Sequence, residues 1–152
     1  MTITNHILAG SIIGLTVSNP VLAIVLGFIS HFIMDILPHF GYPGKNGYVV
    51  FKHRLMKLVS VTTFITSAAV VILLAVTGNW FALLVGLIAA SPDGIGFYNY
   101  LKNERKQLPS TGILGTFHVK FHRWIQWCER PWGIGVEVAV SAALFYVMWL
   151  SI

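Results

Sequence analysis

Five apolar stretches, each bounded by a turn sequence or a polar segment, are the feature of this 152-residue chain that most restricts its fold. Only 10% of the residues are charged, whereas a soluble domain usually carries about 25%. The chain therefore lacks the polar residues that would cover a water-facing surface. This balance excludes a soluble globular domain, a disordered tail and a nucleic-acid-binding module, and it indicates a lipid bilayer as the solvent.

The apolar stretches form two pairs and one single segment. Ser18-Asn19-Pro20 separates the first pair and Thr77-Gly78-Asn79 the second, and both are typical turn sequences. The fourth stretch closes at Ser91-Pro92-Asp93-Gly94. The last stretch is about 20 residues long, which is enough to span ~30 Å of hydrocarbon.

We therefore expect an all-α integral membrane bundle of about five helices, built as two helical hairpins plus a C-terminal helix. The whole chain, 1–152, forms one membrane domain in this interpretation. The expected helices cover residues 3–17, 21–37, 55–76, 80–91 and 133–151.

Two polar segments, 39–54 and 98–115, interrupt the apolar stretches and are expected to be loops. Residues 117–128 follow the second segment, and their apolar side chains recur at helical spacing. These side chains are Phe117, Phe121, Trp124 and Ile125, and Lys120 and Arg123 mark the wetter side. The pattern predicts an amphipathic helix at the cytoplasmic face of the membrane.

All ten basic residues lie at the loop between the two hairpins or in the stretch before the last helix, whereas the two tight turns carry none. Positive charge collects in the cytoplasmic loops of membrane proteins. The sequence therefore predicts a multi-pass protein of the cytoplasmic (inner) membrane with its N-terminus inside.

The six histidines map to this same basic end of the expected bundle. They are His6, His31, His39, His53, His118 and His122. At a helix rise of ~1.5 Å per residue, His6 lies ~20 Å from the first turn, His31 ~17 Å and Asp35 ~23 Å. Asp93 lies ~20 Å from the second turn. We therefore expect these four side chains to lie in one layer across the bundle.

A metal ion needs several nitrogen or oxygen ligands around one centre. His31 and Asp35 are four residues apart and share a helix face, and His118 and His122 have the same spacing. The single cysteine excludes a cysteine-cluster site. The pattern thus predicts one or two ions of Zn, Mn or Fe. The candidate ligands are His6, His31, Asp35, His39, Asp93, His118 and His122.

These residues also have ordinary structural interpretations. A lone histidine in an apolar helix often packs against its neighbours, and Asp93 after Ser91-Pro92 is also typical of a turn. For Glu137, one turn into the last helix, the alternatives are an ion pair with Arg123 or Arg130 and a place beside the metal. Ionisable residues are costly within a membrane, however, and they commonly mark a functional site there.

Short motifs along the chain resemble a known family. Thr4-Asn5-His6-x-x-x-Gly10, then Ser91-Pro92-Asp93, then the paired histidines, are similar to the LexA-binding, inner-membrane-associated metal-dependent hydrolase family. More distantly, His31-x-x-x-Asp35 followed by Pro38 and His39 resembles zinc-dependent phospholipase C and the fungal zinc nucleases. The resemblance implies metal-dependent hydrolysis. The chain departs from the family's P-D-x-D-H motif, because Gly94-Ile95-Gly96 follows Asp93.

Together these features predict a membrane-embedded metal-dependent hydrolase that acts on a phosphoester, either a phospholipid or an isoprenoid phosphate, at the cytoplasmic membrane face. Asp93 or Glu137 is the candidate proton acceptor. The candidate phosphate-binding residues are Lys52, Arg54, Arg105 and Arg123. Membrane lipid is the expected partner, nucleic acid is not expected, and the sequence leaves a homo-oligomer open.

Two other function classes stay open at this point. A membrane di-iron oxygenase or desaturase would use the pair His118-x-x-x-His122, although the chain has no HxxHH run. A non-enzymatic ion-binding, metal-binding, transport or haem-carrying protein would use buried histidine and aspartate as a relay or as ligands.

Overall fold

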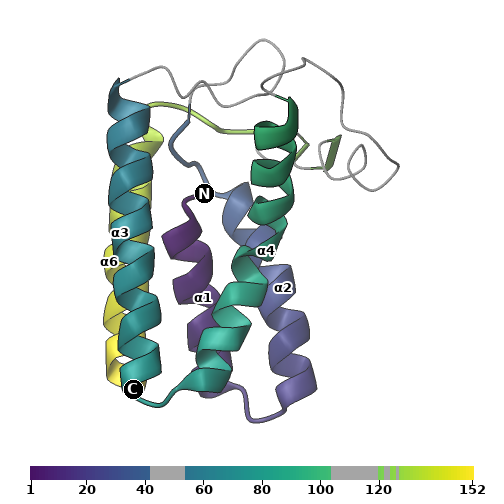
Figure 1. Cartoon of the computed structure of the whole chain (residues 1–152), viewed down its shortest axis with the longest axis vertical. Coiled ribbons are helices and arrows are strands. Elements are labelled where there is room, and N and C mark those ends of the chain that lie inside the picture. The colour runs from purple at the N-terminus through teal and green to yellow at the C-terminus, as the bar shows by residue number, and fades with distance from the viewer. Residues whose placement is uncertain (42–53, 104–119, 122–123, 126) are drawn as a thin grey trace.

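The structure is a computed structural model that describes residues 1–41, 54–103, 120–121, 124–125 and 127–152, with side chains on the fourth helix described as far as Gly94 (Figure 1). Its helices are α1 (Ile3–Thr16), α2 (Pro20–Ile36), α3 (Arg54–Val76), α4 (Trp80–Asn103) and α6 (Gly133–Ser151). The predicted all-α architecture of about five helices is confirmed.

Both tight turns produce helical hairpins. In the first, the Oδ1 atom of Asn19 accepts a 3.0 Å hydrogen bond from the backbone N–H of Leu22, and Pro20 takes the first helical position. Proline is favoured there because that N–H has no partner within the helix. In the second, Gly78 has a φ of 76°, a left-handed conformation that glycine adopts without steric cost.

The expectation that the fourth helix ends at residue 91 is wrong, because α4 continues through Pro92 to Asn103. Proline has no N–H, so Pro92 leaves the carbonyl of Ile88 without its usual helical donor. The Ser91 hydroxyl donates a 2.8 Å hydrogen bond to that same carbonyl. Asp93 therefore lies on a helix rather than in a turn, and residues 98–103 are helical rather than a loop.

Helix α1 is the centre of the bundle and contacts each of the four other helices. Every residue from Thr4 to Ser11 is buried. Close approach of α1 to α4 depends on Gly10, because a Cβ atom there would lie 2.6 Å from the Cβ of Ala89 and 2.7 Å from the carbonyl oxygen of Val85. The core formed around α1 includes the fully buried side chains of Leu8, Leu74 and Met148.

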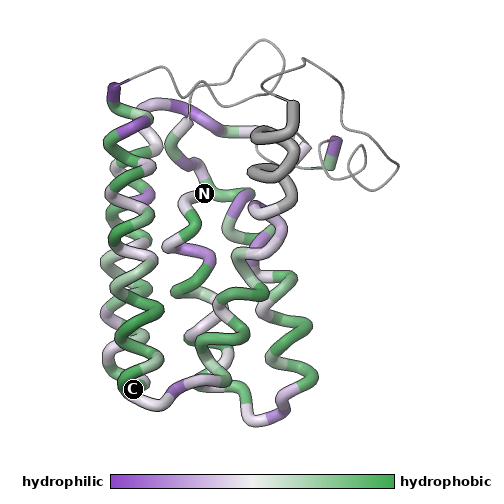
Figure 2. The backbone as a smooth tube through the Cα atoms, in the orientation of Figure 1, coloured by the Kyte–Doolittle hydropathy of each residue, from purple (hydrophilic) through white to green (hydrophobic). Residues whose placement is uncertain are grey.

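Two helices are long and apolar enough to cross a membrane. The best 18-residue windows of α3 and α6 have mean hydropathies of 2.3 and 1.8, and only 17% of each window is buried. A core helix of a soluble protein would be mostly buried, so α3 and α6 are more exposed than such a helix. Figure 2 shows apolar residues along most of the bundle. The C-terminus lies at the end that holds the two tight turns, away from the N-terminus (Figure 1).

Of the predicted amphipathic helix 117–128, residues 120–121 and 124–125 are helical, and 117–119, 122–123 and 126 lie outside the described residues. Phe121 packs edge-on against Phe32 of α2, with ring centroids 5.3 Å apart. The indole N–H of Trp127 donates to the carbonyl of Ile36 at 3.1 Å. This segment therefore docks on the C-terminal end of α2, while Trp124 and Trp127 stay 76% and 68% exposed.

Gly10→Ala should lower the free energy of unfolding by about 1–3 kcal/mol, because its methyl group overfills the α1–α4 contact. Gly135→Ala is the matched control on α6, where a Cβ atom would meet nothing within 4 Å. The control should leave the stability unchanged or raise it by up to about 1 kcal/mol. Unfolding of the two purified variants in detergent measures the difference between their free energies of unfolding. Equal stabilities would contradict the close approach of α1 to α4.

Candidate metal centre

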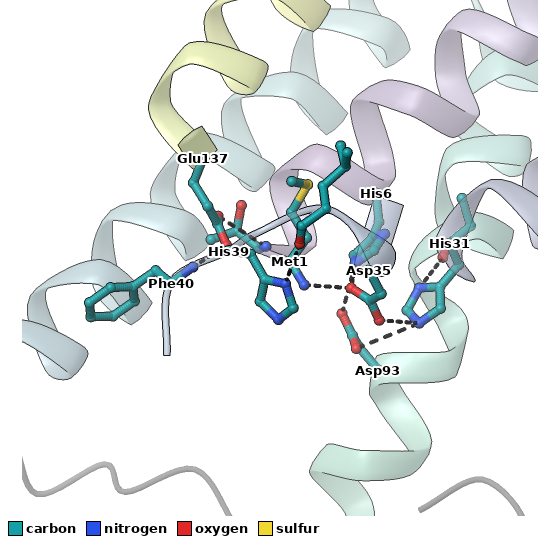
Figure 3. A network of polar contacts seen from close by, with 11 residues as sticks. Met1, His6, His31, Asp35, His39, Phe40, Asp93 and Glu137 are labelled. Carbon is teal, nitrogen blue, oxygen red and sulfur yellow. Dashed lines mark hydrogen bonds and ion pairs between the residues drawn. The ribbon is translucent and has the colours of Figure 1, made fainter. Parts of the chain in front are cut away.

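Four ionisable side chains from three helices meet at one point of the bundle (Figure 3). His6 comes from α1, His31 and Asp35 from α2, and Asp93 from α4. One potential ligand atom from each residue can be chosen so that all four lie within 4.8 Å of one another. Among the described residues, this is the group whose geometry could hold a metal ion.

Each carboxylate faces both imidazole rings. The Nε2 atom of His6 lies 3.2 Å from Oδ1 of Asp35 and 3.7 Å from Oδ2 of Asp93. The Nε2 atom of His31 lies 3.4 Å from Oδ2 of Asp35 and 3.9 Å from Oδ1 of Asp93. The rings themselves are stacked, with centroids 4.1 Å apart. Two nitrogens and two carboxylates therefore converge on a common centre.

The ring of His31 is oriented by a backbone carbonyl. Its Nδ1 atom lies 2.9 Å from the carbonyl oxygen of Ala89, which can only accept a hydrogen bond. Nδ1 must therefore carry the proton, and in the neutral ring the lone pair is on Nε2. That lone pair is directed toward Asp35 and Asp93. A cation placed between them would be bound by Nε2 and by both carboxylates.

Burial strengthens the case for a bound cation. The side chains of His6, His31 and Asp35 are 0% exposed, whereas Asp93 is 31% exposed. The Nδ1 atom of His6 has no hydrogen-bond partner within the described part of the chain, although buried polar atoms nearly always have one. The α-ammonium group of Met1 lies 2.5 Å from Oδ1 of Asp35 and pairs with this carboxylate, so a metal ion would share Asp35 with it or displace it. The donor set and its burial fit a metal ion.

His39 and Glu137 lie beside this group and have other partners. The Nδ1 atom of His39 is 2.8 Å from the carbonyl oxygen of Leu37, and burial lowers the pKa of this histidine. The carboxylate of Glu137 accepts hydrogen bonds from the backbone N–H groups of Thr2, at 3.1 Å, and Phe40, at 3.3 Å. Glu137 thus holds together two segments that lead into the cluster.

The structure brings together four of the seven predicted ligands, His6, His31, Asp35 and Asp93, at the common level that helix rise predicts. Of the predicted phosphate-binding residues, Arg54 begins α3 and is exposed. The other predicted residues lie outside the described part of the chain. They are His118, His122, Lys52, Arg105 and Arg123.

Sequence reasoning missed Asn5, which fastens α1 to α6. Its Nδ2 atom donates to the carbonyl of Glu137 at 3.4 Å, and its Oδ1 atom accepts a 2.6 Å hydrogen bond from Ser141. The sequence feature that indicates this role is an amide side chain next to His6 in an otherwise apolar stretch. If such an amide is buried, it needs hydrogen-bond partners on a neighbouring helix.

Comparison with known proteins adds no assignment: no family model matches this chain, and neither a curated protein nor a solved structure shows significant similarity to it.

The purified protein should bind a divalent transition metal, and His6→Ala or His31→Ala should weaken that binding by about a hundredfold or more, because each removes one ligand. Ser30→Ala is the matched control, since Ser30 is buried next to His31 but donates to the carbonyl of Gly27 within its own helix. Calorimetric titration with Zn²⁺ and Mn²⁺, with elemental analysis, measures the effect. Wild-type affinity in both histidine variants would exclude this centre.

Proposed function

We propose that this chain is a membrane-embedded, metal-dependent hydrolase that cleaves a phosphoester of a phospholipid or isoprenoid phosphate at the cytoplasmic membrane face. The observation that supports the proposal most is the group formed by His6, His31, Asp35 and Asp93, whose ligand atoms lie within 4.8 Å of one another in an otherwise apolar bundle. Such residues are costly in a membrane and mark functional sites. The sequence resemblance to metal-dependent hydrolases supports the same reaction class.

The donor set narrows the choice of ion. Two imidazoles and two carboxylates, without a thiolate, suit Zn, Mn or Fe. His6, His31 and Asp35 are buried and would hold the ion in place. When bound, such an ion would lower the pKa of a coordinated water toward ~7 and polarise a phosphoryl oxygen.

The partly exposed carboxylate of Asp93 is placed to meet the substrate. It is the member of the group that reaches the surface of the described bundle, so water and a phosphoester approach from its side. Asp93 can complete the ligand set or accept the proton of the attacking water. Glu137, which is engaged by two backbone N–H groups, is the alternative proton acceptor.

Basic residues at the same end of the bundle as the metal centre would bind the phosphate. Arg54, exposed at the start of α3, is the described candidate, and the other three are Lys52, Arg105 and Arg123. Guanidinium groups bind phosphate oxygens through paired hydrogen bonds. A site at the basic end of a membrane bundle lies near the lipid head groups, which favours a lipid-linked phosphoester.

Detergent-purified protein supplied with Zn²⁺ or Mn²⁺ should release phosphate or a phosphorylated head group from phospholipid or isoprenoid phosphates. His31→Ala and Asp35→Ala should each lower the turnover by about a hundredfold or more, and a chelator should abolish it until metal is returned. Ser30→Ala should retain wild-type turnover.

Other results would redirect the assignment. Unchanged turnover in both ligand variants would refute the proposed hydrolase. Tight metal binding without turnover of any phosphoester would indicate a non-enzymatic metal-binding protein. An iron-dependent visible absorption band would favour the di-iron oxygenase.

The proposed orientation places the two tight turns outside the cell and the basic end inside. In a Cys128→Ser background, Ser18→Cys should react with a membrane-impermeant maleimide in intact cells, because Ser18 is exposed in the first turn. Lys120→Cys, also exposed but at the basic end, should react only after permeabilisation. The reverse labelling pattern would invert the topology and place the metal centre outside.

A further inference from the structure

All five tryptophans of the chain lie on the outside of the bundle, and they gather at its two ends. Trp80 begins α4 and Trp149 lies in the last turn of α6, so both are at the end that holds the tight turns (Figure 1). Trp124, Trp127 and Trp132 precede α6 at the basic end. Each tryptophan is between 58% and 76% exposed. Tryptophan collects at the two interfaces of a membrane, where its ring meets lipid chains and its N–H meets water.

The distance between the two groups of tryptophans fits the hydrocarbon core of a bilayer. Trp132 and Trp149 flank the same helix, α6, and are seventeen residues apart, or ~26 Å along the helix axis. A typical hydrocarbon core is ~30 Å thick. Bilayers and helices adjust to a mismatch of a few ångströms at a modest cost in free energy. The two groups are therefore placed to lie at the two faces of one bilayer.

Exposed charge is confined to one side of this interval. Among the described residues, the charged side chains that are exposed are all basic, and they are Arg54, Lys57, Lys120 and Arg130. Lys57 lies nineteen residues before Val76 at the tight-turn end of α3, or ~29 Å from it, which is as far from that end as Trp132 or farther. Basic side chains beside a tryptophan group suit the anionic head groups of a cytoplasmic leaflet.

The same distances place the metal centre between the two tryptophan groups. Asp93 is thirteen residues from Trp80 along α4, or ~20 Å, which leaves ~6 Å to the level of Trp132. Glu137, beside the centre in Figure 3, gives an independent measure, because it lies five residues into the bundle from Trp132, or ~8 Å. Two helices thus agree that the centre is recessed behind the tryptophans of the basic end.

The outer surface at the level of the metal centre is apolar. Ile33 lies between His31 and Asp35 in the sequence, and it is exposed whereas both of them are buried. On α6, Val138 is exposed and its neighbour Glu137 is buried. A helix that faces water has polar residues outside and apolar residues inside. The reverse pattern is the one that lipid-facing helices adopt, because ionisable side chains in a membrane turn toward the bundle interior.

We propose that the two tryptophan groups mark the faces of the hydrocarbon core around this bundle, and that the metal centre lies ~6–8 Å inside the core on the basic side. The exposed arginine and lysine side chains would contact anionic lipid head groups on that side. Membrane embedding is part of the function proposed above, whereas the depth rests on the tryptophans and the charges. At this depth, a phosphoester carried by a lipid of the same leaflet lies closer to the centre than one in solution.

Nitroxide spin labels on single cysteines measure this depth. The full-length protein, in a Cys128→Ser background, is reconstituted into vesicles of phosphatidylcholine and phosphatidylglycerol. Ile33→Cys reports the level of the metal centre, and Arg130→Cys, exposed at the basic end, is the matched control outside the core. Oxygen dissolves in hydrocarbon, whereas chromium oxalate, a trianion, is excluded from it. The ratio of oxygen to chromium oxalate accessibility should be about tenfold or more higher at Ile33→Cys than at Arg130→Cys.

A second helix provides a check, because Val138→Cys should give the same high ratio as Ile33→Cys. Each labelled variant should keep the helix content of the wild-type protein in its circular dichroism spectrum. Equal ratios at all three positions would show that this end of the bundle lies in water, and they would overturn the proposed depth. A high ratio at Val138→Cys with a low ratio at Ile33→Cys would leave α2 facing water and would overturn it as well.

These outcomes are separate from those for the hydrolase. High ratios at Ile33→Cys and Val138→Cys in a protein that hydrolyses no phosphoester would support the depth and refute only the proposed reaction. Metal-dependent turnover together with a low ratio at Ile33→Cys would support the reaction and overturn the depth.

Discussion

Three consecutive residues of α1 hold the bundle together, and each is directed to a different neighbour. Thr4 binds α3, Asn5 binds α6, and His6 faces the carboxylates of α2 and α4. Successive helix positions are rotated by ~100°, so three of them point in directions spread over ~200°. The apolar surface of the bundle can face lipid because these polar contacts, rather than burial of the outer helices, fix where each helix lies.

The same arrangement gives the two sides of α1 different neighbours. Gly10 lets α1 approach α4 closely, and this brings His6 within reach of Asp93. On the opposite side, Thr4 binds α3 and Asn5 binds α6. One buried helix thus has a charged side toward α2 and α4 and a hydrogen-bonded side toward α3 and α6.

Much of this arrangement follows from the sequence alone. Turn residues and the lengths of the apolar stretches predict most helix ends to within about one residue. The rise of a helix predicts that His6, His31, Asp35 and Asp93 lie at one level of the bundle. The end of α4 was not predictable from Pro92, because the Ser91 hydroxyl replaces the missing donor. The faces that α3 and α6 turn toward α1 were not predictable either, because uniformly apolar helices carry no periodicity that reveals them.

The partial exposure of Asp93 has a consequence for how a metal would enter and leave. His6, His31 and Asp35 are buried and Asp93 is partly exposed, so an ion that enters from the side of Asp93 meets this carboxylate first. Asp93 also follows Pro92, where the helix lacks a backbone hydrogen bond, and helices bend most readily at such positions. The carboxylate that an entering ion would meet first therefore stands on the part of α4 whose backbone is least constrained.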